Sequence, residues 1–393
     1  MNQWLKKAVI YHILLDRFAG YDEKQAADWD CPVFIGGNLL GVINSLPYLQ
    51  KLNITALWLS PFCKTVEYHG YHVTDYFTVD PHFGDFKDLE QLTTKCHKHN
   101  IRVIADFVPN HCHETHPYFV DALQQDSKRR NWFFFDAENR PMGFLDAGYL
   151  PKFNLDNPET QKHIIDSALK WLKAGIDGLR LDHVIGVSTD FLKALSEQTK
   201  KEFPESVLFG EAVIDLDSAR KYHNTLHLRN QLWRRWFGFT QERLQRDYIG
   251  LLDGVLDFEF AELVRRYVKG QLTRTQLNRR LKRHFTRYPE TFSLVLFLDN
   301  HDKDRLLFEC GGDVEKVREA FKIMFMAAQE YNQSLVLYYG SEILMEQRGP
   351  ITKYPHADVL ARKAMNWHPG EFQRSFYDFC AEQAHRLRKR KLV

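Results

Sequence analysis

The chain has 393 residues, of which 44% are hydrophobic and 26% charged, with a formal net charge of +2. These values are ordinary for a globular protein and exclude a polyelectrolyte, so no nucleic-acid partner is expected. No apolar run reaches the length of a membrane helix, so no membrane partner is expected either. Six scattered cysteines without a CxxC pair indicate free thiols rather than a disulfide framework.

The first apolar run, AVIYHILL, spans residues 8–15. Lys6 and Lys7 before it give it a faint likeness to a secretion signal. However, Tyr11 and His12 interrupt the run, and no small-residue cleavage site follows it. We therefore expect a first strand here and a cytoplasmic protein.

Seven further apolar, β-branched runs follow, separated by stretches with helical periodicity. The expected strands span residues 8–15, 54–60, 101–107, 177–182, 206–212, 254–260, 294–300 and 334–339. The expected helices span residues 40–52, 85–100, 158–174, 189–203, 226–246, 260–285, 313–330 and 371–390. Eight strands that each precede a helix predict an α/β fold, a parallel sheet closed into a (β/α)8 TIM barrel. The alternative, an open doubly wound sheet, is disfavoured because no glycine-rich phosphate loop follows the first strand.

The connection after the third strand is unusually long. Residues 111–157 hold prolines and turn residues but no clean helical pattern, which is typical of an inserted segment. We expect a short inserted domain at 111–157 and a catalytic barrel made of 1–110 and 158–393. Since the chain stops after the eighth helical pattern, no C-terminal β-sandwich is expected.

Charged residues gather at the carboxyl ends of four expected strands. The third strand ends in DFVPNH (106–111), the fourth carries Arg180 and Asp182, the fifth ends at Glu211, and the seventh ends in DNHD (299–302). The active sites of such barrels lie at these ends, so we expect the residues to share one mouth. Arg180 and Asp182 leave the same strand face, and a buried charge needs a partner.

Three carboxylates around one cavity suit the cleavage of a glycosidic bond. One carboxylic acid protonates the leaving oxygen, while a second carboxylate attacks the sugar or activates water. Crowding raises the pKa of one carboxyl group, and an arginine keeps its neighbour ionised. We therefore expect Asp182, beside Arg180, to be the nucleophile. Glu211, which has no basic neighbour in the sequence, is expected to be the acid/base.

These motifs resemble the α-amylase family, glycoside hydrolase family thirteen. DFVPNH (106–111), GLRLDHV (178–184), FGEA (209–212) and FLDNHD (297–302) resemble its four signature segments in order and spacing. LPKFN (150–154) resembles the short segment of its inserted domain. The resemblance covers nearly the whole chain.

The resemblance implies a retaining mechanism through a covalent glycosyl–enzyme intermediate. It implies Asp182 as the nucleophile, Glu211 as the acid/base and Asp302 as the stabiliser of the transition state. The residues that it implies for sugar binding are Arg180, His111, His301, Tyr71 and His69 at the cleaved bond, and Asp358 and Arg362 at the next sugar outward.

Several positions depart from the family pattern. Many members place Lys and His where this chain has Ile185 and Gly186, so the leaving-group side differs from the one usual for long α-1,4 chains. No cofactor is expected to be required. The family allows a calcium ion, with Asn110 and Asn154 as the ligands here, although calcium prefers charged oxygens.

The expected function is hydrolysis of α-1,4 linkages, with α-1,6 linkages as a second class, in short maltooligosaccharides or cyclodextrins, and the α-glucan is the small-molecule partner. A transglycosylase or isomerase of the same family, which would use a sugar acceptor, remains an alternative. Two other classes are more remote. HCHETH (111–116) imitates the spacing of a zinc metallo-hydrolase, and a relative without activity could bind sugar only.

Overall fold

The computed structural model describes residues 3–22, 31–222, 225–227 and 240–389. Within them, eight strands form a closed barrel in the order β1-β12-β11-β10-β9-β8-β5-β2. The strands are β1 (Val9–Ile13), β2 (Ala56–Leu59), β5 (Arg102–Phe107), β8 (Gly178–Leu181), β9 (Val207–Gly210), β10 (Gly254–Leu256), β11 (Ser293–Phe297) and β12 (Ser334–Tyr338). Each strand lies within a predicted run apart from one extra residue at Ser293, so the TIM-barrel prediction is confirmed.

The chain divides into two compact units. Unit 1 contains the described residues of Met1–Ser60, His82–Val103 and Leu256–Val393, and unit 2 contains those of Pro61–Pro81 and Ile104–Val255. Unit 1 therefore holds β1, β2, β11 and β12. Unit 2 holds β8, β9 and most of β5 and β10.

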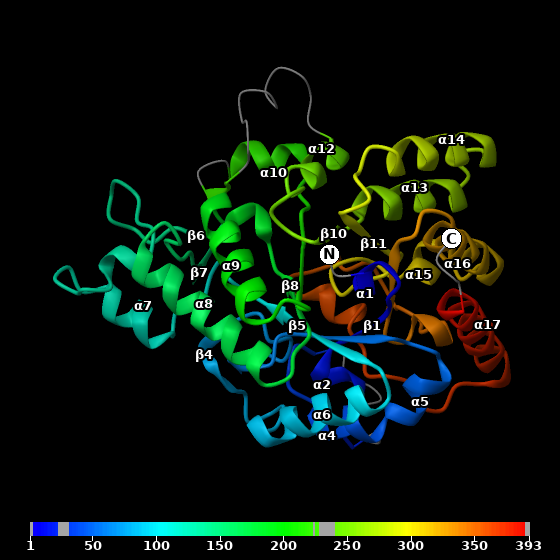
Figure 1. The fold of residues 1–393 in the computed structure, drawn as a ribbon, viewed down its shortest axis with the longest axis horizontal. Coiled ribbons are helices and arrows are strands. Elements are labelled where there is room, and N and C mark those ends of the chain that lie inside the picture. The colour runs from blue at the N-terminus through cyan, green and yellow to red at the C-terminus, as the bar shows by residue number, and fades with distance from the viewer. Residues whose placement is uncertain (1–2, 23–30, 223–224, 228–239, 390–393) are drawn as a thin grey trace. The chain divides into compact units, whose positions relative to one another are not determined.

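The longer helices of unit 1 follow the predicted patterns with two corrections, and three short helices, at 3–6, 15–18 and 306–309, were not predicted. They are α1 (Gln3–Lys6), α2 (Leu15–Phe18), α4 (Leu39–Asn44), α5 (Leu46–Lys51), α6 (Phe86–Lys98), α13 (Phe258–Val268), α14 (Arg274–Phe285), α15 (Leu306–Glu309), α16 (Val314–Glu330) and α17 (Glu371–Arg388). The predicted helix 40–52 is broken at Ser45, before a proline in the first turn of α5. The predicted helix 260–285 is the packed pair α13 and α14 in Figure 1. Gly270, with φ of 75°, lies between them.

The predicted strand 254–260 is also shorter than expected. It ends at Leu256, because the carboxylate of Asp257 accepts a hydrogen bond from the backbone N–H of Phe260 and thereby begins α13. An apolar run that continues from a strand into a buried helix has no internal signal for this change.

Unit 2 contains an element that the sequence patterns did not indicate. Strands β3 (Cys63–Thr65) and β4 (Val73–Val79) form an antiparallel hairpin outside the barrel. The helices of this unit are α7 (Pro117–Ala122), α8 (Pro158–Lys173), α9 (Thr189–Glu202), α10 (Leu216–Lys221) and α12 (Gln241–Arg246). Of the predicted helix 226–246, only its end is seen, as α12, because residues 228–239 lie outside the described chain.

The long connection between β5 and α8 is compactly folded. It contains α7, a short 3-10 turn at Arg130–Trp132 and a hairpin of β6 (Gly143–Phe144) with β7 (Ala147–Pro151). Its assignment as a separate inserted domain, residues 111–157, stays a prediction. Isolated bridges join His111 to Lys152 and Phe133 to Phe153. The first of these bridges ties the end of the segment to the residues just after β5.

Strand β8 positions the central arginine of unit 2. Its side chains alternate, so Leu179 and Leu181 leave one face while Gly178 and Arg180 leave the other. A Cβ added at Gly178 would overlap Val207 on neighbouring β9. The absence of a side chain at Gly178 therefore allows β9 to lie close beside β8.

We predict that Gly178→Ala lowers the free energy of unfolding by about 1–3 kcal/mol, because the methyl group has to displace Val207. Gly148→Ala is the matched control, since Gly148 is exposed on β7 and a Cβ there meets no atom within 4 Å. Urea unfolding of both variants measures the difference. Equal stability of the two variants would show that the close contact of β8 with β9 is not required.

Candidate active site

The side chain of Arg180 connects three carboxylates in unit 2. Its Nη1 lies 2.8 Å from Oδ1 of Asp106 and 2.8 Å from Oδ1 of Asp182. Its Nη2 lies 2.8 Å from Oε1 of Glu211. The strand register explains this arrangement, because Asp106 on β5 is the direct partner of Arg180 on β8, and β9 pairs on the other side. The predicted nucleophile and acid/base are therefore brought together on one guanidinium.

Burial and charge act against each other in this cluster. Arg180 is fully buried, which disfavours its charge, but Asp106 and Glu211 outweigh burial and raise the pKa of its guanidinium. Burial raises the pKa of Asp106 to about 6, against the opposing effect of Arg180. Glu211 has no basic neighbour in the sequence, but in the folded structure the Arg180 guanidinium contacts its carboxylate.

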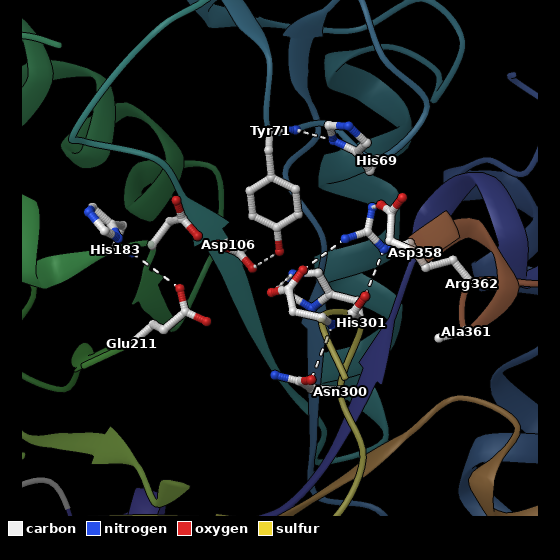
Figure 2. Close-up of polar contacts among 12 residues, drawn as sticks. His69, Tyr71, Asp106, His183, Glu211, Asn300, His301, Asp358, Ala361 and Arg362 are labelled. Carbon is white, nitrogen blue, oxygen red and sulfur yellow. Dashed lines mark hydrogen bonds and ion pairs between the residues drawn. The ribbon is translucent and has the colours of Figure 1, made fainter. Parts of the chain in front are cut away.

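Asp106 is a site residue that the sequence analysis did not select. Its Oδ2 accepts a hydrogen bond of 2.8 Å from the hydroxyl of Tyr71, which Figure 2 shows pointing at Asp106. The backbone N–H of Tyr71 donates in turn to Nδ1 of His69 over 3.1 Å. The predicted pair His69 and Tyr71 is thus connected through Asp106 to Arg180. The available signal was the position of Asp106 as the first residue of DFVPNH, near the carboxyl end of β5.

His111 ends the DFVPNH segment that begins on β5, and its buried imidazole is neutral. Its Nδ1 is 3.2 Å from Nδ2 of Asn110, an amide donor, so the imidazole proton resides on Nε2. Burial, with smaller contributions from His72 and Lys152, lowers the pKa of His111 to about 3. The ring of Phe144 contacts both His111 and His183, at centroid distances of 4.8 and 4.5 Å.

His183 directly follows the expected nucleophile and has an unusual backbone. Its φ is 44°, a left-handed conformation that is uncommon for a residue with a side chain. This turn brings its backbone N–H to 3.4 Å from Oε2 of Glu211, as the dashed line in Figure 2 shows. The residues Ile185 and Gly186, which depart from the family pattern, are both buried.

The proposed calcium ligands have other partners. Oδ1 of Asn110 accepts a hydrogen bond of 3.0 Å from the ammonium of Lys152. Nδ2 of Asn154 donates to the carbonyl of Asn131, and Oδ1 of Asn154 accepts from the backbone N–H of Asp156. A cationic ligand does not fit a calcium site, so this donor set does not match the ion that the family allows.

The HCHETH segment does not gather its histidines around a metal. Nδ1 of His113 is 2.8 Å from the hydroxyl of Thr115, and Nδ1 of His116 accepts from the backbone N–H of Tyr118. Among the residues that the structure describes, no group of three His, Cys, Asp or Glu side chains could hold a metal ion.

A second group of predicted residues lies in unit 1, after β11. The carboxylate of Asp302 is 2.8 Å from Nη2 of Arg362 and 3.0 Å from Nε2 of His301. Arg362 also pairs with Asp358 and donates to the carbonyl of His301 over 2.8 Å. Figure 2 shows the Arg362 guanidinium beside Asp358. The four predicted residues of this unit therefore form one connected cluster.

Two further residues of unit 1 support His301 and were not selected from the sequence. The ring of His12, on β1, stacks on Trp58, on β2, with centroids 3.7 Å apart and an interplanar angle of 9°. His301 meets the His12 ring edge to face at 5.1 Å. All three rings are buried, so the position of His301 is set by packing as well as by its ion pair.

Comparison with known sequences decides the family. The family model described as alpha amylase, catalytic domain, matches residues 12–383. The chain belongs to the α-amylase family. Of this family, "Alpha-amylase 2" of Dictyoglomus thermophilum is 30% identical over 384 residues, which are 96% of this chain and 62% of that protein. A cyclomaltodextrinase of Geobacillus thermopakistaniensis is 31% identical over 397 residues, which are 95% of this chain and 61% of that protein. The chain thus spans less than two thirds of the length of these two relatives.

Solved structures agree with the α-amylase family assignment. The ligand-free cyclic alpha-maltosyl-(1→6)-maltose hydrolase from Arthrobacter globiformis superposes with a TM-score of 0.79 and 26% identity, over 98% of this chain and 83% of that one. A structure named cyclomaltodextrinase superposes with a TM-score of 0.81 and 27% identity, over 99% and 65% of the two chains. Within the described part of this α-amylase family chain, no helix is long and apolar enough to cross a membrane.

We predict that His111 makes the protein sensitive to acid. The unfolded chain binds a proton at the imidazole near pH 6.5, whereas the folded pKa of His111 is about 3. The stabilisation is therefore present above the unfolded pKa and is lost as the pH falls toward about 3. In His111→Asn, the free energy of unfolding should fall less steeply between pH 6 and 4 than it does in the wild type. The two slopes should differ by about 1.4 kcal/mol per pH unit.

Urea unfolding at several pH values measures this slope. His99→Asn is the control, because His99 is exposed at the end of α6 and should keep the wild-type slope. A wild-type slope in His111→Asn would contradict the assignment of His111 as a histidine kept neutral by burial.

Proposed function

We propose that the protein is a retaining α-glucoside hydrolase that cleaves α-1,4 linkages, and α-1,6 linkages as a second class, in short maltooligosaccharides or cyclodextrins. The observation that carries the proposal is the contact of one buried guanidinium with both Asp182 and Glu211. Each of these two residues is 8% exposed, whereas Arg180 is fully buried. Their carboxylates are therefore held in place yet accessible to a substrate.

In this proposal, the carboxylate of Asp182 attacks the anomeric carbon while Glu211 donates its proton to the departing glycosidic oxygen. Water then attacks the covalent intermediate, Glu211 takes its proton, and Asp182 leaves as a carboxylate. Arg180 supports the first step because it favours the ionised form of Asp182. The three ionised carboxylates would outnumber the single guanidinium, which favours a proton on one of them before reaction.

The remaining roles follow from family membership. We propose that Asp302 stabilises the oxocarbenium-like transition state, held by Arg362 and His301. Sugar contacts are assigned to His111, whose neutral ring offers an Nε2–H donor. The other proposed sugar contacts are Arg180, His301, the platform Tyr71 with His69, and the pair Asp358 and Arg362 at the next sugar outward.

A preference for short substrates is supported by the buried positions of Ile185 and Gly186. Ile185 has no exposed surface and cannot replace the contacts of a lysine with an outer sugar. Two similar proteins, a cyclomaltodextrinase and a cyclic alpha-maltosyl-(1→6)-maltose hydrolase, carry names that support this substrate class. The proposal includes residues 111–157 as a short inserted domain. It also includes a cytoplasmic location, in line with an intracellular maltogenic amylase of Bacillus subtilis that is 29% identical over 384 residues.

The nucleophile assignment predicts that Asp182→Asn remains folded but loses at least about three orders of magnitude in kcat on maltotriose, because an amide cannot form the glycosyl ester. The control is Asp190→Asn, since the Asp190 side chain is 87% exposed on α9. Its turnover should equal that of the wild type. Circular dichroism checks the fold of both. Wild-type turnover by a folded Asp182→Asn sample would refute the proposed mechanism.

The substrate assignment predicts that kcat/KM for maltotriose or β-cyclodextrin is at least as large as that for amylose. An extra sugar raises kcat/KM only if it gains contacts in the transition state, and each absent contact forfeits about 1 kcal/mol. Initial rates with all three substrates decide the question. The same time courses separate hydrolysis from transfer to a sugar acceptor, because transfer gives products longer than the substrate. A much larger kcat/KM for amylose would contradict the preference for short substrates.

A further inference from the structure

The ammonium of Lys152 lies in a buried cage of oxygens in unit 2. Lys152 follows β7 and is only 2% exposed. Its Nζ is 3.0 Å from Oδ1 of Asn110 and 3.0 Å from the carbonyl oxygen of Thr225, and it also contacts the carbonyl oxygen of Gly186. These three oxygens come from separate segments, after β5, after β8 and after α10.

The cage is chemically a cation site. All three oxygens belong to amides, so they can only accept hydrogen bonds, and an ammonium has three donors to match them. Amide and carbonyl oxygens are also ligands that calcium uses in proteins. An ammonium and a metal ion would therefore compete for the same oxygens, and one excludes the other by charge.

We propose that the Lys152 ammonium takes the place of a divalent cation in this cage, so that the protein is folded and stable without calcium. A single tethered charge holds the three segments together, as an ion would. The proposal does not depend on the proposed reaction, because its tests measure metal binding and thermal stability.

The cage also sets the orientation of a site residue. Because Lys152 holds Oδ1 of Asn110, the amide directs its Nδ2 toward Nδ1 of His111. This hydrogen bond leaves the imidazole proton of His111 on Nε2. Lys152 is thus a positioning residue for His111. Gly186 is part of the same arrangement, since a Cβ at that position would overlap Oδ1 of Asn110.

The first experiment compares the wild type with Lys152→Asp in EDTA and in millimolar CaCl2. The wild type should show the same Tm in both, within about 1 °C, and should bind no calcium in the cage. Lys152→Asp removes the ammonium and adds a shorter side chain with charged oxygens, which leaves room for an ion. In EDTA its Tm should fall by about 5 °C or more, and CaCl2 should restore most of the loss. Calorimetric titration should give one calcium per chain with a Kd of about 1 mM or tighter.

Two further variants act as controls. Lys152→Met fills the space without a charge or an oxygen, so its Tm should fall equally in EDTA and in CaCl2. Adding Asn110→Ala to Lys152→Asp removes a cage oxygen and should abolish the calcium response. If Lys152→Asp does not fold, the wild type and Lys152→Met decide the question through their Tm values.

Three results would overturn the proposal. The first is a wild-type Tm that rises with CaCl2 and loses this response in Asn110→Ala, which would mean that calcium itself fills the cage. The second is a Lys152→Met variant as stable as the wild type. The third is a folded Lys152→Asp variant that binds no calcium.

Discussion

The buried guanidinium of Arg180 is the constraint around which unit 2 is arranged. A charge without exposed surface is destabilising unless its donors are matched, and here two of the nitrogens contact Asp106, Asp182 and Glu211 at 2.8 Å. The match requires β5, β8 and β9 to be adjacent and in one register, because each strand supplies or directly precedes a partner. In this unit, the strand register of the barrel and the contacts of Arg180 with its three carboxylates therefore depend on each other.

Unit 1 also contains an arginine that holds a carboxylate, but here the two residues are distant in the chain. Arg362 holds Asp302 from 60 positions further on, and it is itself held by Asp358. In both units an arginine fixes the position of a carboxylate. Asp182 receives its arginine from the same strand, whereas Asp302 receives it from the segment before α17.

Much of the fold was predictable because the eight barrel strands are buried on both faces and are therefore continuous apolar runs. The clustering of Asp182 and Glu211 was predictable for a related reason, since parallel strands end on the same side. The role of Asp106 could not be predicted, because its partner Tyr71 comes from the loop of the unexpected hairpin β3–β4. Strand β3 has only three residues, and the burial of β4 does not alternate along the strand. The split between α13 and α14 was missed because the apolar periodicity continues across Gly270.

The Lys152 cage has a consequence for the conditions under which the protein keeps its shape. A bound ion stabilises a fold only while its free concentration exceeds its dissociation constant, so chelators and ion-poor compartments remove it. A side-chain ammonium is covalently attached, and its local concentration does not change on dilution. The geometry of the loops at Asn110 and Gly186 is therefore independent of divalent ions, including where phosphate or other chelators are abundant. The corresponding limitation is that the ammonium cannot be exchanged for a free ion, so the concentration of divalent ions cannot regulate these loops.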